Sequence, residues 1–135
     1  MRRAALVALL VLGLTGCNGG TVDKHALKRD AEKLSSLATE GHLLANDMRK
    51  GASTKYFARV HSKELSRAAS NMADALAERP TSVGIEPDVR RLSKIAATIS
   101  RDLEQLHLHP TNRTLAARLQ NKLSDDADAA DELSK

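Results

Sequence analysis

Residues 87–108, PDVRRLSKIAATISRDLEQLHL, contain the most regular hydrophobic pattern in the chain. Six apolar residues recur there at steps of three and four: Val89, Leu92, Ala96, Ile99, Leu103 and Leu106. This spacing places all six on one face of a helix, as in helices that pack lengthwise against others. Pro87 suits the first turn of such a helix. The end of this helix is predicted near Leu108, because His109 precedes Pro110 and a helical conformation is disfavoured at that position.

Residues 22–50 are predicted to form an earlier helix. Thr21 or Asp23 can cap its start, and Gly51 can end it in the left-handed conformation that favours glycine. Its apolar stripe consists of Leu27, Ala31, Leu34, Leu37, Ala38, Leu44, Ala45 and Met48. Gly41 lies within this stripe, where it weakens the helix but permits close approach of a neighbouring one.

Two more helices are predicted on either side of residues 87–108. Ser53 or Thr54 starts the second helix of the chain, which runs to about residue 79, just before Pro80. Its predicted buried face is Phe57, Val60, Leu65, Ala68, Ala69, Met72 and Leu76. Thr111 is predicted to cap the last helix, whose apolar face is Leu115, Leu119, Leu123, Ala127, Ala130 and Leu133.

Four helices with short connections predict an all-α fold, an antiparallel four-helix bundle over residues 22–135. No stretch alternates with period two, so no strand is expected. Tyr56 and Phe57 are the only aromatic residues, and the core must therefore be aliphatic. Four aspartates weaken the end of the last helix and leave open a three-helix arrangement with a frayed fourth: Asp125, Asp126, Asp128 and Asp131. These aspartates are interpreted as a solvated acidic surface.

The residues before the bundle have the three parts of an export signal. Arg2 and Arg3 supply the charge, residues 4–14 supply an apolar core, and small residues follow. A core of eleven residues is too short for a transmembrane helix, which needs about 20. An ordinary secretory signal is one interpretation of this segment.

The four residues that close this segment, Leu14-Thr15-Gly16-Cys17, resemble the lipobox of bacterial lipoproteins. The resemblance implies a diacylglyceryl group on the Cys17 sulfur and cleavage of the Gly16–Cys17 bond. Residues 1–16 would then be a signal peptide and residues 17–21 a lipidated tether. Anchoring by two or more acyl chains is stable, whereas one chain binds only marginally.

The residue after the cysteine bears on the location of such a lipoprotein. Asp at this position tends to keep lipoproteins of two-membrane bacteria in the inner membrane. Asn18 therefore favours the periplasmic side of the outer membrane. In a bacterium with one membrane, the protein would be anchored to the outer face of the cell membrane.

The net charge of +4 falls to +2 without residues 1–16, which carry two arginines and no acid. Nucleic acid is therefore not an expected partner, because such binding needs a concentrated basic face. Cys17 is the only cysteine, so its lipidation would leave none for a disulfide.

Three residues are weak candidates for metal ligands: His61, Glu104 and His107. Glu104-x-x-His107 matches the spacing of ferritin-like di-metal sites, but those sites need a second such motif, which the chain lacks. His61 is expected on the buried face of its helix. Most such histidines are half-buried side chains without a ligand role, so no metal or cofactor is predicted.

Glu40, Leu44-Ala45 and Lys55-Tyr56-Phe57-Ala58 resemble the spacing of a ferritin-like domain of unknown function found in bacterial envelope proteins. That family tends to carry a histidine two turns after the phenylalanine, where this chain has Leu65. His61 lies one turn after Phe57 instead. The resemblance implies a helical bundle, and the departure leaves no metal site to transfer.

No nucleophile elbow or phosphate loop is present in the sequence, and an enzyme is not expected. The sequence favours a non-enzymatic envelope lipoprotein, a helical bundle that acts through contacts with a protein partner, a second copy or the envelope. The alternative is a ferritin-like bundle that binds a metal or small ligand. That alternative requires Glu40, His61, Glu104 and His107 to meet in the bundle core.

Overall fold

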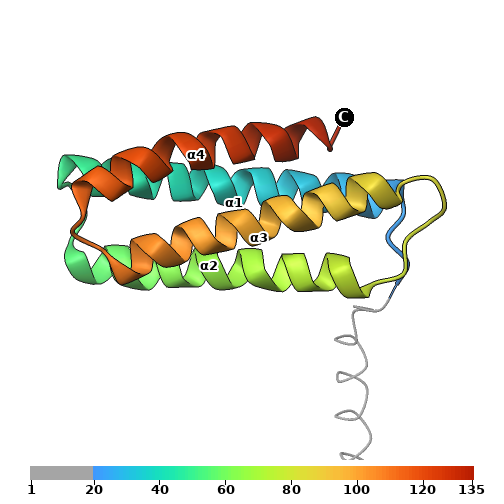
Figure 1. The fold of residues 1–135 in the computed structure, drawn as a ribbon, viewed down its shortest axis with the longest axis horizontal. Helices are drawn as coiled ribbons and strands as arrows, with labels where there is room; N and C mark the ends of the chain where they lie inside the picture. The colour runs from blue at the N-terminus through green and yellow to red at the C-terminus, as the bar shows by residue number, and fades with distance from the viewer. Residues whose placement is uncertain (1–19) are drawn as a thin grey trace, which may run out of the picture.

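The structure, a computed structural model, describes residues 20–135. The predicted signal peptide, its cleavage bond and the predicted lipid anchor Cys17 lie outside the described residues. The described chain forms four helices: α1 Lys24–Lys50, α2 Lys55–Glu78, α3 Glu86–Leu108 and α4 Arg113–Glu132. Successive helices run in opposite directions (Figure 1), and residues 20–135 contain no strand. The prediction of an all-helical bundle is confirmed for this part of the chain.

Short polar side chains start three of the four helices. The Asp23 carboxylate accepts a hydrogen bond from the Ala26 backbone N–H at 2.8 Å, and this bond lowers the pKa of Asp23. Thr54 caps α2 in the same way. Asn112 caps α4 by accepting from the Leu115 N–H at 2.9 Å, so the prediction of Thr111 as the cap is wrong by one residue.

The closest contacts occur within two pairs of helices, α2 with α3 and α1 with α4. Small side chains face the partner in each pair and allow this proximity. Between α2 and α3, the Ser66 hydroxyl donates to the Ser100 carbonyl at 2.9 Å, and the Ser100 hydroxyl donates back to the Ser66 carbonyl at 3.0 Å. These reciprocal bonds require the two helices to lie close together.

Large aliphatic side chains fill the space between the two pairs. The largest that are fully buried are Leu34, Leu92, Ile99, Leu103, Leu106 and Leu123. Gly41 of α1 lies against this layer, and a Cβ atom there would be 2.8 Å from Leu103 Cδ2. The predicted role of Gly41 in close helix packing is therefore confirmed.

The buried face of α2 differs from the prediction. Phe57 and Val60 are exposed, and so is Ala68. The buried residues are Ala58, Ser62, Leu65, Ser66, Ala69, Ala73 and Leu76. The close contact with α3 explains the change, because alanine and serine fit there and a phenylalanine does not. Both aromatic residues of the chain therefore lie outside the core.

The end of α4 is ordered and packed. The helix continues to Glu132, Ala127 and Ala130 are buried, and Leu133 is partly buried against the core. The alternative of three helices with a frayed fourth is therefore wrong. The four aspartates alternate with the buried residues of this stretch, Leu123, Ala127 and Ala130, and do not interrupt the helix.

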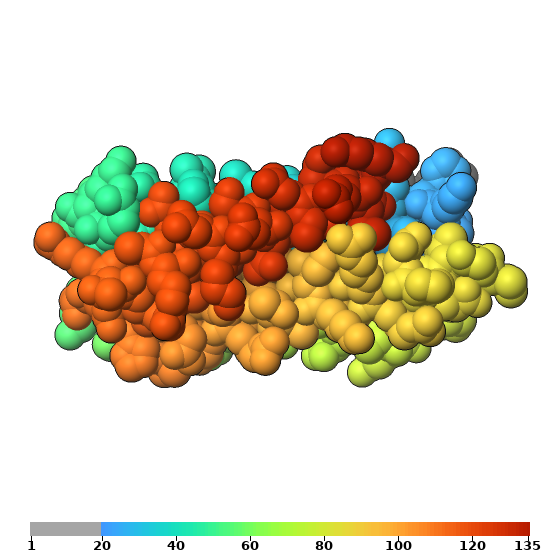
Figure 2. Space-filling view, turned by 45° about the horizontal axis from the view of Figure 1, so that its top comes forward, coloured from blue at the N-terminus to red at the C-terminus, as the bar shows by residue number. Residues whose placement is uncertain are grey.

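The chain before α1 is joined to the loop between α2 and α3. Val22 is fully buried; its N–H donates to the Pro80 carbonyl at 2.7 Å, and its carbonyl accepts from the Ser82 N–H at 2.9 Å. The first helix therefore starts two residues later than predicted. Arg79 also donates to the Gly20 carbonyl at 3.0 Å. The space-filling view shows the N-terminal residues packed against this loop at one end of the elongated bundle (Figure 2).

Candidate functional site

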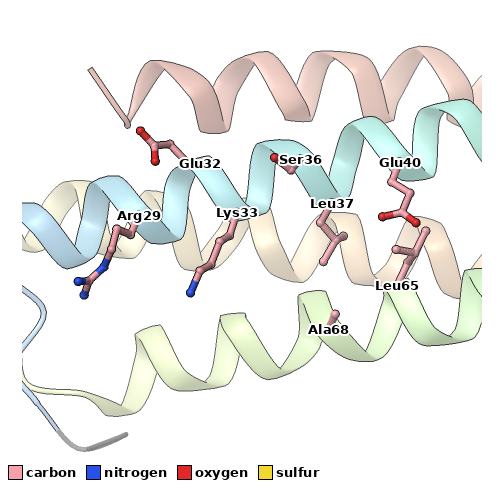
Figure 3. Close-up of a pocket in the computed structure, with 8 residues that line it drawn as sticks. All are labelled: Arg29, Glu32, Lys33, Ser36, Leu37, Glu40, Leu65 and Ala68. Atoms are coloured by element: carbon pink, nitrogen blue, oxygen red, sulfur yellow. The ribbon is translucent and has the colours of Figure 1, made fainter. Parts of the chain in front are cut away.

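An open groove of about 510 Å³ lies between α1 and α2. It exists because these two helices belong to different close pairs and pack less tightly on each other. Its lining residues are Arg29, Glu32, Lys33, Ser36, Leu37, Glu40, Leu65 and Ala68. Figure 3 shows Leu37 and Lys33 extending from α1 toward α2, while Glu32 points away from α2. The groove thus offers an apolar floor with side chains of both charges at its rim.

His61 contacts Glu40, one of the residues that line this groove. Its Nε2 atom lies 2.8 Å from Glu40 Oε1 on α1, and its Nδ1 atom lies 3.8 Å from Glu64 on its own helix. The ring stacks on Phe57 with 5.2 Å between centroids. His61 is partly buried, and its contact with Glu40 joins α2 to α1.

Glu104 and His107 lie on the side of α3 that faces α2. The Lys63 ammonium donates to both Glu104 carboxylate oxygens at 3.0 Å. This hydrogen bond holds the pKa of Glu104 below its ordinary value. His107 Nδ1 lies 2.8 Å from the Arg59 carbonyl oxygen. Both side chains therefore have partners on α2.

The four candidate ligands do not meet in the core. Glu40 and His61 form a pair between α1 and α2, whereas Glu104 and His107 contact α2 from α3. Residues 61 and 63 project from nearly opposite sides of α2, which separates the two groups. Within residues 20–135, no group of three or more histidine or acidic side chains is arranged to hold a metal ion. The arrangement that the ligand-binding alternative requires is absent from these residues.

A buried charged cluster between α3 and α4 was missed from the sequence. Asp102 of α3 is 7% exposed, and the Lys122 ammonium of α4 lies 3.0 Å from its Oδ1 and 2.9 Å from its Oδ2. Asp126, one turn after Lys122, is half-buried, and its Oδ2 has no hydrogen-bond partner within residues 20–135. Burial and the nearby charge of Asp102 raise the pKa of Asp126. Asp126 is therefore not part of a fully solvated surface.

The position of Asp102 carried a signal in the sequence. It lies three residues after Ile99 and four before Leu106, beside the apolar stripe of α3. A charged residue at such a position needs a counter-charge on the helix that covers it. Lys122 fulfils this need from a separate helix, which the sequence pattern does not pair with α3.

Comparisons of the chain with protein-family models, with curated proteins and with solved structures gave no match. None of the helices between residues 20 and 135 has an apolar stretch long enough to cross a bilayer.

Proposed function

We propose that the protein is a bacterial envelope lipoprotein, anchored to a membrane through Cys17, whose helical bundle acts by contact and not by catalysis. The observation that carries this proposal is the sequence Leu14-Thr15-Gly16-Cys17 directly before the bundle. In a two-membrane bacterium, Asn18 assigns the anchored protein to the periplasmic side of the outer membrane.

The position of Gly20 supports a short and direct attachment. Three residues after Cys17, its carbonyl accepts a hydrogen bond from Arg79, and Val22 is bonded to the loop between α2 and α3. Three extended residues span about 10 Å. A lipid on Cys17 would therefore hold this end of the bundle close to the membrane surface.

The contacts of the titratable side chains support a role without catalysis. Glu104 is bonded to Lys63, and His61 to Glu40. His107 lies against the backbone carbonyl of Arg59. Each contact joins two helices, so the side chains singled out as candidate ligands have partners within the fold.

The test is membrane fractionation of the full chain and its Cys17→Ala variant, with labelling by a fatty acid. We expect the unaltered chain to be labelled and to sediment with membranes, and the variant to lose the label and the cleavage at residue 16. The Thr15→Ser variant is the matched control, because it keeps a small residue in the motif, and it should behave as the unaltered chain. Unchanged labelling of the Cys17→Ala variant would overturn the proposal.

A further inference from the structure

Positive charge gathers at the end of the bundle opposite Gly20. This end is formed by residues 46–59 and 105–118, which the antiparallel helices bring together (Figure 1). These two segments, here called the basic end, carry one carboxylate, Asp47, and six basic side chains: Arg49, Lys50, Lys55, Arg59, Arg113 and Arg118. The remaining described residues carry sixteen acidic and thirteen basic side chains. Folding therefore brings together basic side chains from two segments that are distant in sequence, which the net charge of the chain does not reveal.

The charges of the basic end are not neutralised by neighbours. Arg49 donates hydrogen bonds to Gln120 and Asn46, which are both uncharged. Within residues 20–135, none of the six basic side chains forms an ion pair with a carboxylate. Their combined field is therefore available to attract an anionic partner.

Exposed apolar side chains occupy the same end. Tyr56 is 79% exposed and Phe57 is 53% exposed, and Val60, Leu43 and Leu108 are exposed near them. Glu40 of α1 and His61 of α2 contact each other, and the two helices are antiparallel. Leu43 lies one turn after Glu40, and Phe57 lies one turn before His61. Leu43 and Phe57 therefore lie at the same height along the bundle axis, next to the Glu40–His61 pair. The contact of His107 with Arg59 places the end of α3 beside this region.

We propose that the basic end binds the surface of an anionic lipid bilayer. Lys55 and Arg59 would face the headgroup phosphates, and Tyr56 and Phe57 would enter the interfacial layer between the headgroups and the acyl chains. Basic side chains gain from the negative surface potential of such a bilayer, as they would beside any anionic surface. The exposed apolar side chains are the feature that favours a bilayer over other anionic partners. Tyrosine and other amphipathic side chains are enriched at the level of the headgroups, and protruding apolar residues can insert there.

This inference goes beyond the anchor at Cys17 and does not depend on it. The hydrophobic core that the structure describes lies entirely within residues 22–133. The bundle can therefore be prepared as residues 18–135 without a lipid, after circular dichroism has confirmed its helical content. Failure of lipidation at Cys17 would leave the result of this experiment unchanged. Failure of the bundle to bind vesicles would likewise leave the test of the Cys17 anchor unchanged.

The experiment measures sedimentation of this bundle with vesicles. The vesicles are phosphatidylcholine alone, or phosphatidylcholine with about one third phosphatidylglycerol, which is anionic. We expect binding to the anionic vesicles and at least about tenfold weaker binding to the neutral ones. Raising the salt from about 0.05 M to about 0.5 M should release the protein, because it screens the exposed charges.

Variants locate the binding surface. Lys55→Glu with Arg59→Glu should weaken binding about tenfold or more. The matched reversal, Lys28→Glu with Arg90→Glu, alters exposed basic residues outside the basic end and should leave binding within about twofold. Tyr56→Ser with Phe57→Ser should also weaken binding, because apolar insertion is lost. Val83→Ser is the control for this pair, since Val83 is 95% exposed in the loop between α2 and α3.

Any one of four results would overturn the inference. One is equal binding to neutral and anionic vesicles, and another is equal loss of binding in the control and test reversals. The third is complete displacement by double-stranded DNA at the same concentration of phosphate, because the surface would then respond to charge alone. Absence of vesicle binding at low salt would count in the same way.

Discussion

The Lys122 ammonium of α4 lies 2.9 Å from Oδ2 of Asp102 on α3. The positive charge of Lys122 acts on two carboxylates, one of which is Asp102. The second carboxylate is Asp126, one helical turn after Lys122. The Lys122 side chain is 50% exposed, whereas the Asp102 side chain is only 10% exposed. The lysine therefore brings a solvated charge to the edge of a buried acidic group, which lowers the cost of burying that group.

Replacement of Lys122 by methionine should destabilise the bundle at neutral pH. The stem of the side chain is kept, but the carboxylates of Asp102 and Asp126 lose their counter-charge. We expect the free energy of unfolding at pH 7 to fall by about 1–3 kcal/mol, toward the lower value because Lys122 is half-exposed. The loss should shrink as the pH falls toward about 4, because Asp126, whose pKa is raised, takes up a proton and one of the unpaired charges is removed. Urea unfolding at both pH values measures this, and Arg118→Met is the exposed control on the same helix. Equal stability of the two variants at pH 7 would contradict this account of the cluster.

Replacement of Asp126 by asparagine should have the opposite effect. The pKa of Asp126 is raised above its ordinary value of 3.8, so the folded chain takes up this proton more readily than the unfolded chain. Ionised Asp126 therefore costs stability at neutral pH, and the cost disappears as the pH falls through the raised pKa. We expect the variant to gain up to about 1 kcal/mol at pH 7, a limit set by partial solvent screening. The gain should vanish below about pH 3.5. Asp128→Asn, at an exposed position, should gain nothing, and a similar gain there would reject burial as the cause.

Gly41→Ala should destabilise the bundle slightly, although alanine favours a helix. The helix gains about 1 kcal/mol from the substitution. The new methyl group would lie 2.8 Å from Leu103 Cδ2, and such overpacking of a core costs about 1–3 kcal/mol. We expect a net loss of about 1 kcal/mol, the difference between the two effects. Leu103→Val shortens the side chain and leaves no Cδ atom to meet the new methyl group, so in that background Gly41→Ala should stabilise. A double-mutant cycle of unfolding free energies tests this. Additive effects would show that the two residues do not compete for space.

Ser66→Ala should cost about 1 kcal/mol, because the hydroxyl group that donates to the Ser100 carbonyl is lost. Ser66→Leu should cost more, because the larger side chain prevents the close approach of α2 and α3. Ser70 lies one turn later and makes no hydrogen bond to α3 in the described chain, so Ser70→Ala serves as the control. Thermal unfolding of the three variants measures the order of their stabilities. A Ser66→Leu variant as stable as the unaltered bundle would contradict the steric account.

The helices were predictable from the sequence, and their ends to within one or two residues, because steps of three and four, Gly51 and the capping residues are local signals. The buried face of α2 was not, because the choice between Phe57 and Ala58 depends on how closely α3 approaches. Residue volume at an interface is decided by the partner helix, which the sequence of α2 does not contain. The predicted buried face of α2 was therefore wrong in the first turns of the helix, whereas Leu65, Ala69 and Leu76 were correctly predicted to be buried.

The candidate site was predictable only within single helices. Glu104 and His107 share one face of α3, as their spacing indicates. Their partners, Lys63 and the Arg59 carbonyl, belong to α2, and no periodicity links them to α3. The basic end was hidden for the same reason, since residues 46–59 and 105–118 meet only after all four helices have packed.

The backbone bonds of Val22 determine how the bundle would respond to mechanical tension on its N-terminal side. A pull at residue 20 would act on the first turn of α1 and also on the two hydrogen bonds that Val22 makes with residues 80 and 82. Part of the force would thereby pass into the loop between α2 and α3 and so into the second pair of helices. To peel α1 from the bundle, the pull would first have to break this junction. Both helix pairs would therefore resist the tension together.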